Sequence, residues 1–217
     1  EMDGMTTGGA SAEVYLDNAA TTPTRPEAIE RMDEVMRTAW GNPSSVHAAG
    51  CRAKEVLEES RAVVAGALGV APDEVFFTSG ATESNNLAVR GVCSARRETP
   101  GQIVTSTLEH ASVTRSVRGM RREGGWKVSY IDAVGGALDL DQLRCVLDGV
   151  PTTLITIMNV QNEVGYVFPS EKIGCIRDEL SPDALFHVDA TQAFCKLSAK
   201  PREWHADLVS VARDRRA

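Results

Sequence analysis

Apolar residues along the chain fall into two patterns, short continuous runs and longer segments with helical spacing. The short runs are typical of strands that are covered on both faces of a sheet. They occupy Glu74–Thr78, Ile103–Ser106, Lys127–Ile131, Leu154–Met158, Leu185–Asp189 and Leu208–Val211. Most of these runs are followed by a segment with helical spacing, an order that predicts parallel strands joined by helices.

The segments with helical spacing predict amphipathic helices between these strands. They occupy Ser84–Arg97, Ala111–Arg122, Leu140–Leu147 and Ser170–Glu179, and two earlier helices occupy Pro26–Thr38 and Val46–Leu68. The sequence therefore predicts an α/β fold, with a mostly parallel sheet and helices on both faces. We expect a single domain over residues 14–211, preceded by a flexible segment at 1–13, because no repeat or linker interrupts it.

Charge and composition narrow the class of protein. The chain carries 23 basic and 30 acidic residues, a net charge of −7, which argues against a nucleic-acid partner. No apolar stretch is long enough to cross a bilayer, and the N-terminus lacks a signal-peptide pattern, so we expect a cytoplasmic protein without a membrane partner. The five cysteines form no C-x-x-C pair, so free thiols are expected rather than disulfides or a metal site.

The segment from Phe76 to Asn86 predicts a phosphate site. It combines a strand, a turn of small residues and the start of a helix, whose free N–H groups and positive dipole end attract anions. Gly80 and Ala81 would let the backbone approach a ligand, and Thr82 would add a hydroxyl. An ordinary turn from strand to helix, with Thr82 as a cap, explains the same residues.

Three polar residues follow other predicted strands at their carboxyl ends. His110 could stack on a planar ring and move protons, and Asp189 could pair with a pyridinium nitrogen. Asn162 could donate a hydrogen bond to a phenolic oxygen and a substrate carboxylate. Taken singly, these residues also suit a capping histidine, a helix-capping aspartate and a turn asparagine.

The four sites gain meaning from their common position. Loops at the carboxyl ends of parallel strands converge on one ligand. A phosphate, a planar ring, a pyridine nitrogen and a phenolic oxygen together describe pyridoxal phosphate. The sequence therefore predicts a pyridoxal-phosphate site at this edge of the sheet.

The motifs around these residues resemble the cysteine desulfurase and selenocysteine lyase family, within the class V aminotransferase group of fold-type I pyridoxal-phosphate enzymes. The matching motifs run in family order from about Val14 to Val211. They are Tyr15–Pro23, Gly41–Ser45, Thr78–Asn86, Glu109-His110, Asn162-Glu163-x-Gly165 and His187–Gln192.

The resemblance implies a role for each matched residue. Ala81 and Thr82 would hold the phosphate, while His110 would stack on the ring and assist proton transfer. Asn162 would contact cofactor and substrate, Asp189 the pyridine nitrogen, and Gln192 the phenolic oxygen. The resemblance also implies a reaction in which cysteine becomes alanine and an enzyme cysteine becomes a persulfide. It implies a sulfur-acceptor protein that serves iron–sulfur cluster assembly or tRNA thiolation, and it implies a homodimer.

The tail at 212–217 departs from the family pattern Ser-x-His-Lys. Arg215 stands where the resemblance implies the Schiff-base lysine, and arginine cannot form an imine. A shifted reading frame over Asp214–Ala217 would explain this tail. With the persulfide cysteine and the C-terminal small domain also missing, we expect this chain to be an inactive desulfurase. The alternatives are a non-catalytic scaffold of the same fold, a selenocysteine lyase or another class V enzyme.

Overall fold

A computed structural model describes residues 14–212 of the chain. The predicted flexible segment at 1–13 and most of the tail, residues 213–217 with Arg215, lie outside the described residues. The main sheet has five strands in the order β2-β1-β5-β6-β7, and every neighbouring pair is parallel. The strands are β1 Gln102–Ser106, β2 Lys127–Ile131, β5 Thr152–Met158, β6 Leu185–Asp189 and β7 Leu208–Ser210.

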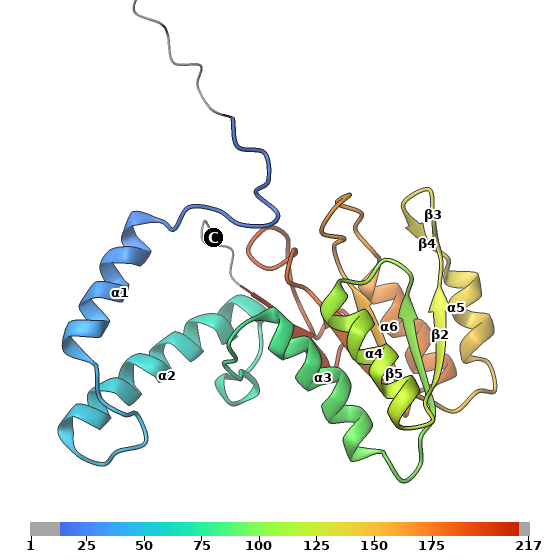
Figure 1. Ribbon diagram of the computed structural model, residues 1–217, viewed down its shortest axis with the longest axis horizontal. Coiled ribbons are helices and arrows are strands. Elements are labelled where there is room, and N and C mark those ends of the chain that lie inside the picture. Colours follow the sequence, from blue (N-terminus) through green and yellow to red (C-terminus); the bar gives the residue numbers. More distant parts are fainter. Residues whose placement is uncertain (1–13, 213–217) are drawn as a thin grey trace, which may run out of the picture.

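Helices cover both faces of this sheet, as the sequence predicts (Figure 1). The helices on the sheet are α3 Ala81–Ala95, α4 Ala111–Glu123, α5 Leu140–Leu147 and α6 Ser170–Leu180. Adjacent strand residues point to opposite faces, so Ile103 packs with α3 and α4 while Val104 packs with α5 and α6. The predicted α/β fold with helices on both faces is confirmed.

Two helices precede the sheet, α1 Pro26–Thr38 and α2 Ala48–Leu68. Pro26 suits the first turn of α1, where its missing N–H has no helical partner to lose. Gly69 ends α2 with a φ of 70°, a conformation that glycine adopts easily. Helix α1 buries no residue, and both helices lie to one side of the sheet (Figure 1).

The prediction of a strand over Glu74–Thr78 is wrong. The structure has a short 3-10 helix, η1 Pro72–Glu74, followed by extended chain that joins no sheet. Phe76 and Phe77 are 78% and 49% exposed, so only Val75 among the three apolar residues of this segment is buried. This segment and β7 both line a groove of about 610 Å³.

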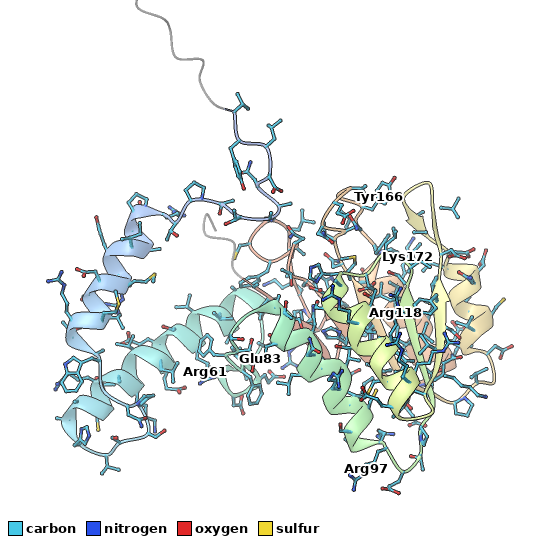
Figure 2. All side chains as sticks on the ribbon, viewed as in Figure 1. Arg61, Glu83, Arg97, Arg118, Tyr166 and Lys172 are labelled. Carbon is cyan, nitrogen blue, oxygen red and sulfur yellow. The ribbon has the colours of Figure 1, made fainter. Side chains whose placement is uncertain are left out.

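Small elements complete the chain. A two-stranded hairpin, β3 Ala133–Val134 with β4 Ala137–Leu138, follows β2 and is too short to show a period in the sequence. The ring of Tyr166, labelled in Figure 2, lies against this hairpin at Gly136. Among the described residues, no helix combines the length and the apolar character that crossing a membrane requires.

Candidate functional site

A cavity of about 740 Å³ lies at the carboxyl edge of the sheet. Because all five strands run parallel, the loops after β1, β5, β6 and β7 meet there. The N-terminal segment around Asp17 and Ala20 forms a further part of the wall. Five of the six predicted site residues line this one cavity, namely Ala81, His110, Asn162, Asp189 and Gln192.

The first turn of α3 reaches the cavity through Ala81. Gly80 precedes the helix with a φ of 154°, which residues with a Cβ rarely adopt. Thr82 is exposed and is not among the residues that line the cavity, and its phosphate contact stays a prediction. The carboxylate of Glu83, labelled in Figure 2, accepts a 2.5 Å hydrogen bond from the Ser79 N–H. Hydrogen bonding from Ser79, first by its side chain and then by its N–H, lowers the Glu83 pKa.

Asp189 ends β6 with its side chain 4% exposed. One carboxylate oxygen accepts a hydrogen bond from Asn85 Nδ2 at 2.7 Å, and the other accepts one from the Thr191 N–H at 3.0 Å. Thr191 Oγ1 is buried and without a partner among the described residues. The carboxylate is therefore held in one orientation at the cavity wall, which suits a cationic ring nitrogen.

His110 has two roles in the structure. Its side chain caps α4, because Nδ1 accepts a hydrogen bond from the Ser112 N–H at 3.1 Å. The same imidazole lines the cavity and lies 2.8 Å from the Ser112 hydroxyl. His110 therefore caps α4 and lines the cavity at the same time, so the two interpretations of this residue are compatible.

Asn162 lies in the loop after β5 and is half-buried at the cavity wall. The turn is organised by its neighbour Gln161, whose Oε1 accepts hydrogen bonds from the N–H groups of Glu163 and Val164. The turn therefore does not depend on the Asn162 amide.

Gln192 connects two parts of the cavity wall. Its Nε2 donates a hydrogen bond to the Ala19 carbonyl at 3.0 Å, which ties the N-terminal segment to the loop after β6. Its Oε1 accepts one from Lys196 Nζ at 2.8 Å. Lys196 also lines the cavity and brings a cationic amine to it, which the sequence did not single out.

Glu109 is a buried carboxyl group beneath this site. Its Oε1 accepts hydrogen bonds from Ser106 Oγ at 2.5 Å and from the Met158 N–H at 3.0 Å, while Oε2 has no partner among the described residues. Burial raises the pKa of Glu109 to about 8, against its two hydrogen bonds, and the nearby charge of Asp189 raises it further. At neutral pH the group is therefore mainly protonated.

Comparison with known proteins places this chain in a family. The model of the aminotransferase class-V family matches residues 14–213. The NifS/IcsS protein homolog of Lactobacillus delbrueckii is 43% identical over 84% of this chain, and the mitochondrial cysteine desulfurase of Candida albicans is 38% identical over 92% of it. These alignments cover 47% and 40% of the two relatives, so the chain spans about half the length of the curated relatives it matches.

Solved structures agree with this placement. A NifS-like protein matches with a TM-score of 0.87 and 35% identity, over 92% of this chain and 54% of that protein. The protein SspA, solved in complex with cysteine, matches with a TM-score of 0.86 and 35% identity, over 93% of this chain and 57% of SspA. The chain belongs to the aminotransferase class-V family, and its relatives there include cysteine desulfurases.

Proposed function

We propose that residues 14–211 form the pyridoxal-phosphate-binding domain of a cysteine desulfurase. The observation that carries this proposal is one cavity lined by Ala81, His110, Asn162, Asp189 and Gln192. The family is dependent on pyridoxal phosphate. Among the similar proteins, one is named as a cysteine desulfurase and another, SspA, was solved in complex with cysteine. Pyridoxal phosphate would supply an electron sink for breaking bonds at the carbon that bears the amino group of an amino acid.

The chemistry of the cavity fits this cofactor. Asp189 presents an oriented carboxylate that would bind the ring nitrogen in its protonated state. The N-terminus of α3 at Ala81 would hold the phosphate through backbone N–H groups, and Thr82 would add its hydroxyl from the rim after a rotation of its side chain.

The remaining residues would position the ring and the substrate. His110 would lie against the ring face and hold or move a proton at Nε2, because Nδ1 already accepts a hydrogen bond. Gln192 would donate to the phenolic oxygen through its amide, and Asn162 would contact the cofactor and the substrate.

The substrate and the partners of the whole protein are part of the proposal. We propose L-cysteine as substrate: its sulfur is transferred to a cysteine thiol of the whole enzyme, which becomes a persulfide, and alanine is released. We propose a sulfur-acceptor protein as partner and a homodimer as the assembly. We propose the cytoplasm as the location, although the relative from Candida albicans is named as mitochondrial. Selenocysteine is the competing substrate. Parallel assays of alanine release from the two amino acids distinguish them, made on the whole protein with lysine restored at position 215.

A binding experiment tests the cofactor proposal directly. The purified chain is titrated with pyridoxal phosphate and the bound fraction is measured by equilibrium dialysis. We expect one saturable site in the wild-type chain and a loss of affinity of at least tenfold in Asp189→Ala, because a charge-assisted hydrogen bond of about 1.5–3 kcal/mol is removed. Asp183→Ala, at an exposed position outside the cavity, is the matched control and keeps wild-type affinity.

Two outcomes would contradict the proposal. Wild-type binding that is absent at millimolar cofactor would favour the scaffold alternative, and equal affinities in both variants would place the ligand elsewhere. Borohydride reduction and mass spectrometry extend the test, since Arg215 cannot form an imine and we expect no stoichiometric adduct there. A stoichiometric adduct at Lys196 would show that this chain supplies its own reactive amine.

A further inference from the structure

A continuous chain of hydrogen bonds joins Asp189 to His110 through two residues that the sequence did not single out. Asn85 Nδ2 lies 2.7 Å from an Asp189 carboxylate oxygen and 2.9 Å from the Ser112 hydroxyl. The Ser112 hydroxyl lies 2.8 Å from His110 Nδ1. The four side chains come from three separate elements, α3, the start of α4 and the end of β6.

The direction of each hydrogen bond follows from chemistry. The ionised Asp189 carboxylate only accepts, so the atom of Asn85 that faces it is the NH₂ group. That group has two hydrogens, and the second is donated to the Ser112 oxygen. The hydrogen of the Ser112 hydroxyl is then directed to His110 Nδ1.

This direction fixes the state of the imidazole. His110 Nδ1 accepts from the Ser112 hydroxyl and also from the Ser112 N–H, so it carries no proton of its own in the neutral ring. The proton of neutral His110 is therefore on Nε2.

Burial makes this chain of hydrogen bonds rigid. Asn85 is fully buried and Ser112 is 6% exposed, so water does not compete for the shared hydrogens. Ser116, one turn later on α4, donates its hydroxyl hydrogen to Asn86 Oδ1 at 2.6 Å or to the Ser112 carbonyl at 2.9 Å, and it lies outside the cavity.

We propose that Asn85 and Ser112 are positioning residues that couple the orientation of the Asp189 carboxylate to the Nε2–H tautomer of His110. The use of this coupling rests on the proposed function, in which Asp189 would bind the ring nitrogen of the cofactor and His110 would lie against the face of the same ring. Asn85 acts through Asp189 and Ser112, and Ser112 acts through His110. The arrangement sets both contacts before any ligand arrives.

Nitrogen-15 NMR of the chain with labelled histidine, without cofactor, tests the coupling. We expect one dominant Nε2–H tautomer for His110 in the wild-type chain. Ser112→Ala removes the hydroxyl donor but keeps the Ser112 N–H, so we expect a partial shift of the tautomer population toward Nδ1–H. Ser112→Thr, which keeps the hydroxyl, should restore the wild-type population. Asn85→Leu should also shift the His110 signal, although Asn85 makes no hydrogen bond to that ring among the described residues.

A second measurement tests the other end of the chain of hydrogen bonds. When the ring nitrogen of the cofactor is labelled with nitrogen-15, its NMR signal reports whether that nitrogen is protonated in the bound cofactor. A variant with a purely structural defect would bind less cofactor but would leave this protonation unchanged. We expect Asn85→Leu to reduce that protonation and to weaken binding about tenfold, the effect of losing one hydrogen bond to a charged group. The double variant Asn85→Leu/Ser112→Ala should be no worse than the worse single variant.

The controls separate this inference from the proposed function. Ser116→Ala removes a buried hydroxyl from the same helix and should leave the tautomer and the affinity unchanged. An unchanged His110 tautomer in both Asn85→Leu and Ser112→Ala overturns the coupling, even if the chain binds cofactor. A wild-type chain that binds no cofactor overturns the proposed function, while the tautomer measurement still decides the coupling. If Asn85→Leu does not fold, Ser112→Ala and Ser112→Thr carry the test.

Discussion

Replacing Glu109 by Gln should stabilise the protein, and increasingly so as the pH rises. Glu109 is 8% exposed, and burial raises its pKa from 4.5 to about 8. Between these two values the folded state keeps a proton that the unfolded state releases. Stability linked to this group is therefore fully present below pH 4.5 and is lost as the pH rises through about 8.

The size of the effect follows from the same two values. A tenfold change in proton affinity corresponds to about 1.4 kcal/mol, so the loss between pH 4.5 and 8 is about 5 kcal/mol. Gln is an isosteric neutral group whose Oε1 can accept the bonds from Ser106 and the Met158 N–H. We expect the free energy of unfolding of Glu109→Gln to rise by about 3 kcal/mol relative to the wild type between pH 4.5 and pH 7.

Urea unfolding at pH 5, 6, 7 and 8 measures this difference, with the buried Trp126 and Trp204 as fluorescent probes. The wild type should lose stability relative to Glu109→Gln at each step. Glu163→Gln, an exposed change at the same cavity, is the control and should stay within about 0.5 kcal/mol of wild type. A difference between Glu109→Gln and wild type that is constant from pH 5 to pH 8 would refute the reasoning.

Three further predictions follow from other parts of the structure. Burial lowers the pKa of His187 from 6.5 to about 4. The protein should therefore lose about 3 kcal/mol of stability as the pH falls from 6.5 to 4. An NMR titration midpoint at 6.5 for His187 would contradict this prediction. Gly80→Ala should destabilise the fold by about 1–3 kcal/mol in urea unfolding because of its φ of 154°, whereas Gly91→Ala, with open space around its Cβ, should not destabilise it. Met32 and Met36 are 59% and 65% exposed on one face of α1, so the double change to Glu should lower self-association in sedimentation experiments, and unchanged sedimentation would argue against this face as a contact.

The middle of the sheet was predictable because β1, β5 and β6 are buried on both faces. Runs such as Leu154–Met158 are apolar almost throughout, and a short run of this kind between helical segments favours a buried parallel strand. The same rule failed for Glu74–Thr78, because an apolar run shows the capacity to pair but not whether a partner strand lies beside it.

The site was predictable to the extent that its residues follow strands. His110, Asn162, Asp189 and Gln192 line the cavity because the loops after parallel strands converge. Thr82 was expected at the phosphate but does not reach the cavity wall, since neighbouring residues on a helix point in different directions.

Other residues of the site gave no signal in the sequence. Asn85 is one polar residue among several at the start of α3, and only the fold shows that it is buried against Asp189. Glu109 adjoins His110 in a motif, but its burial and raised pKa depend on Met158 and Ser106 packing around it. Such pairings arise between distant segments and cannot be read from local pattern.

A crystal structure of this chain grown with pyridoxal phosphate tests the central claim most directly. We expect electron density for the cofactor in the cavity, with the ring nitrogen within about 2.7–3.2 Å of the Asp189 carboxylate and the phosphate at the N-terminus of α3. Cofactor bound at another place, or a cavity that stays without cofactor density at saturating concentration, would contradict it.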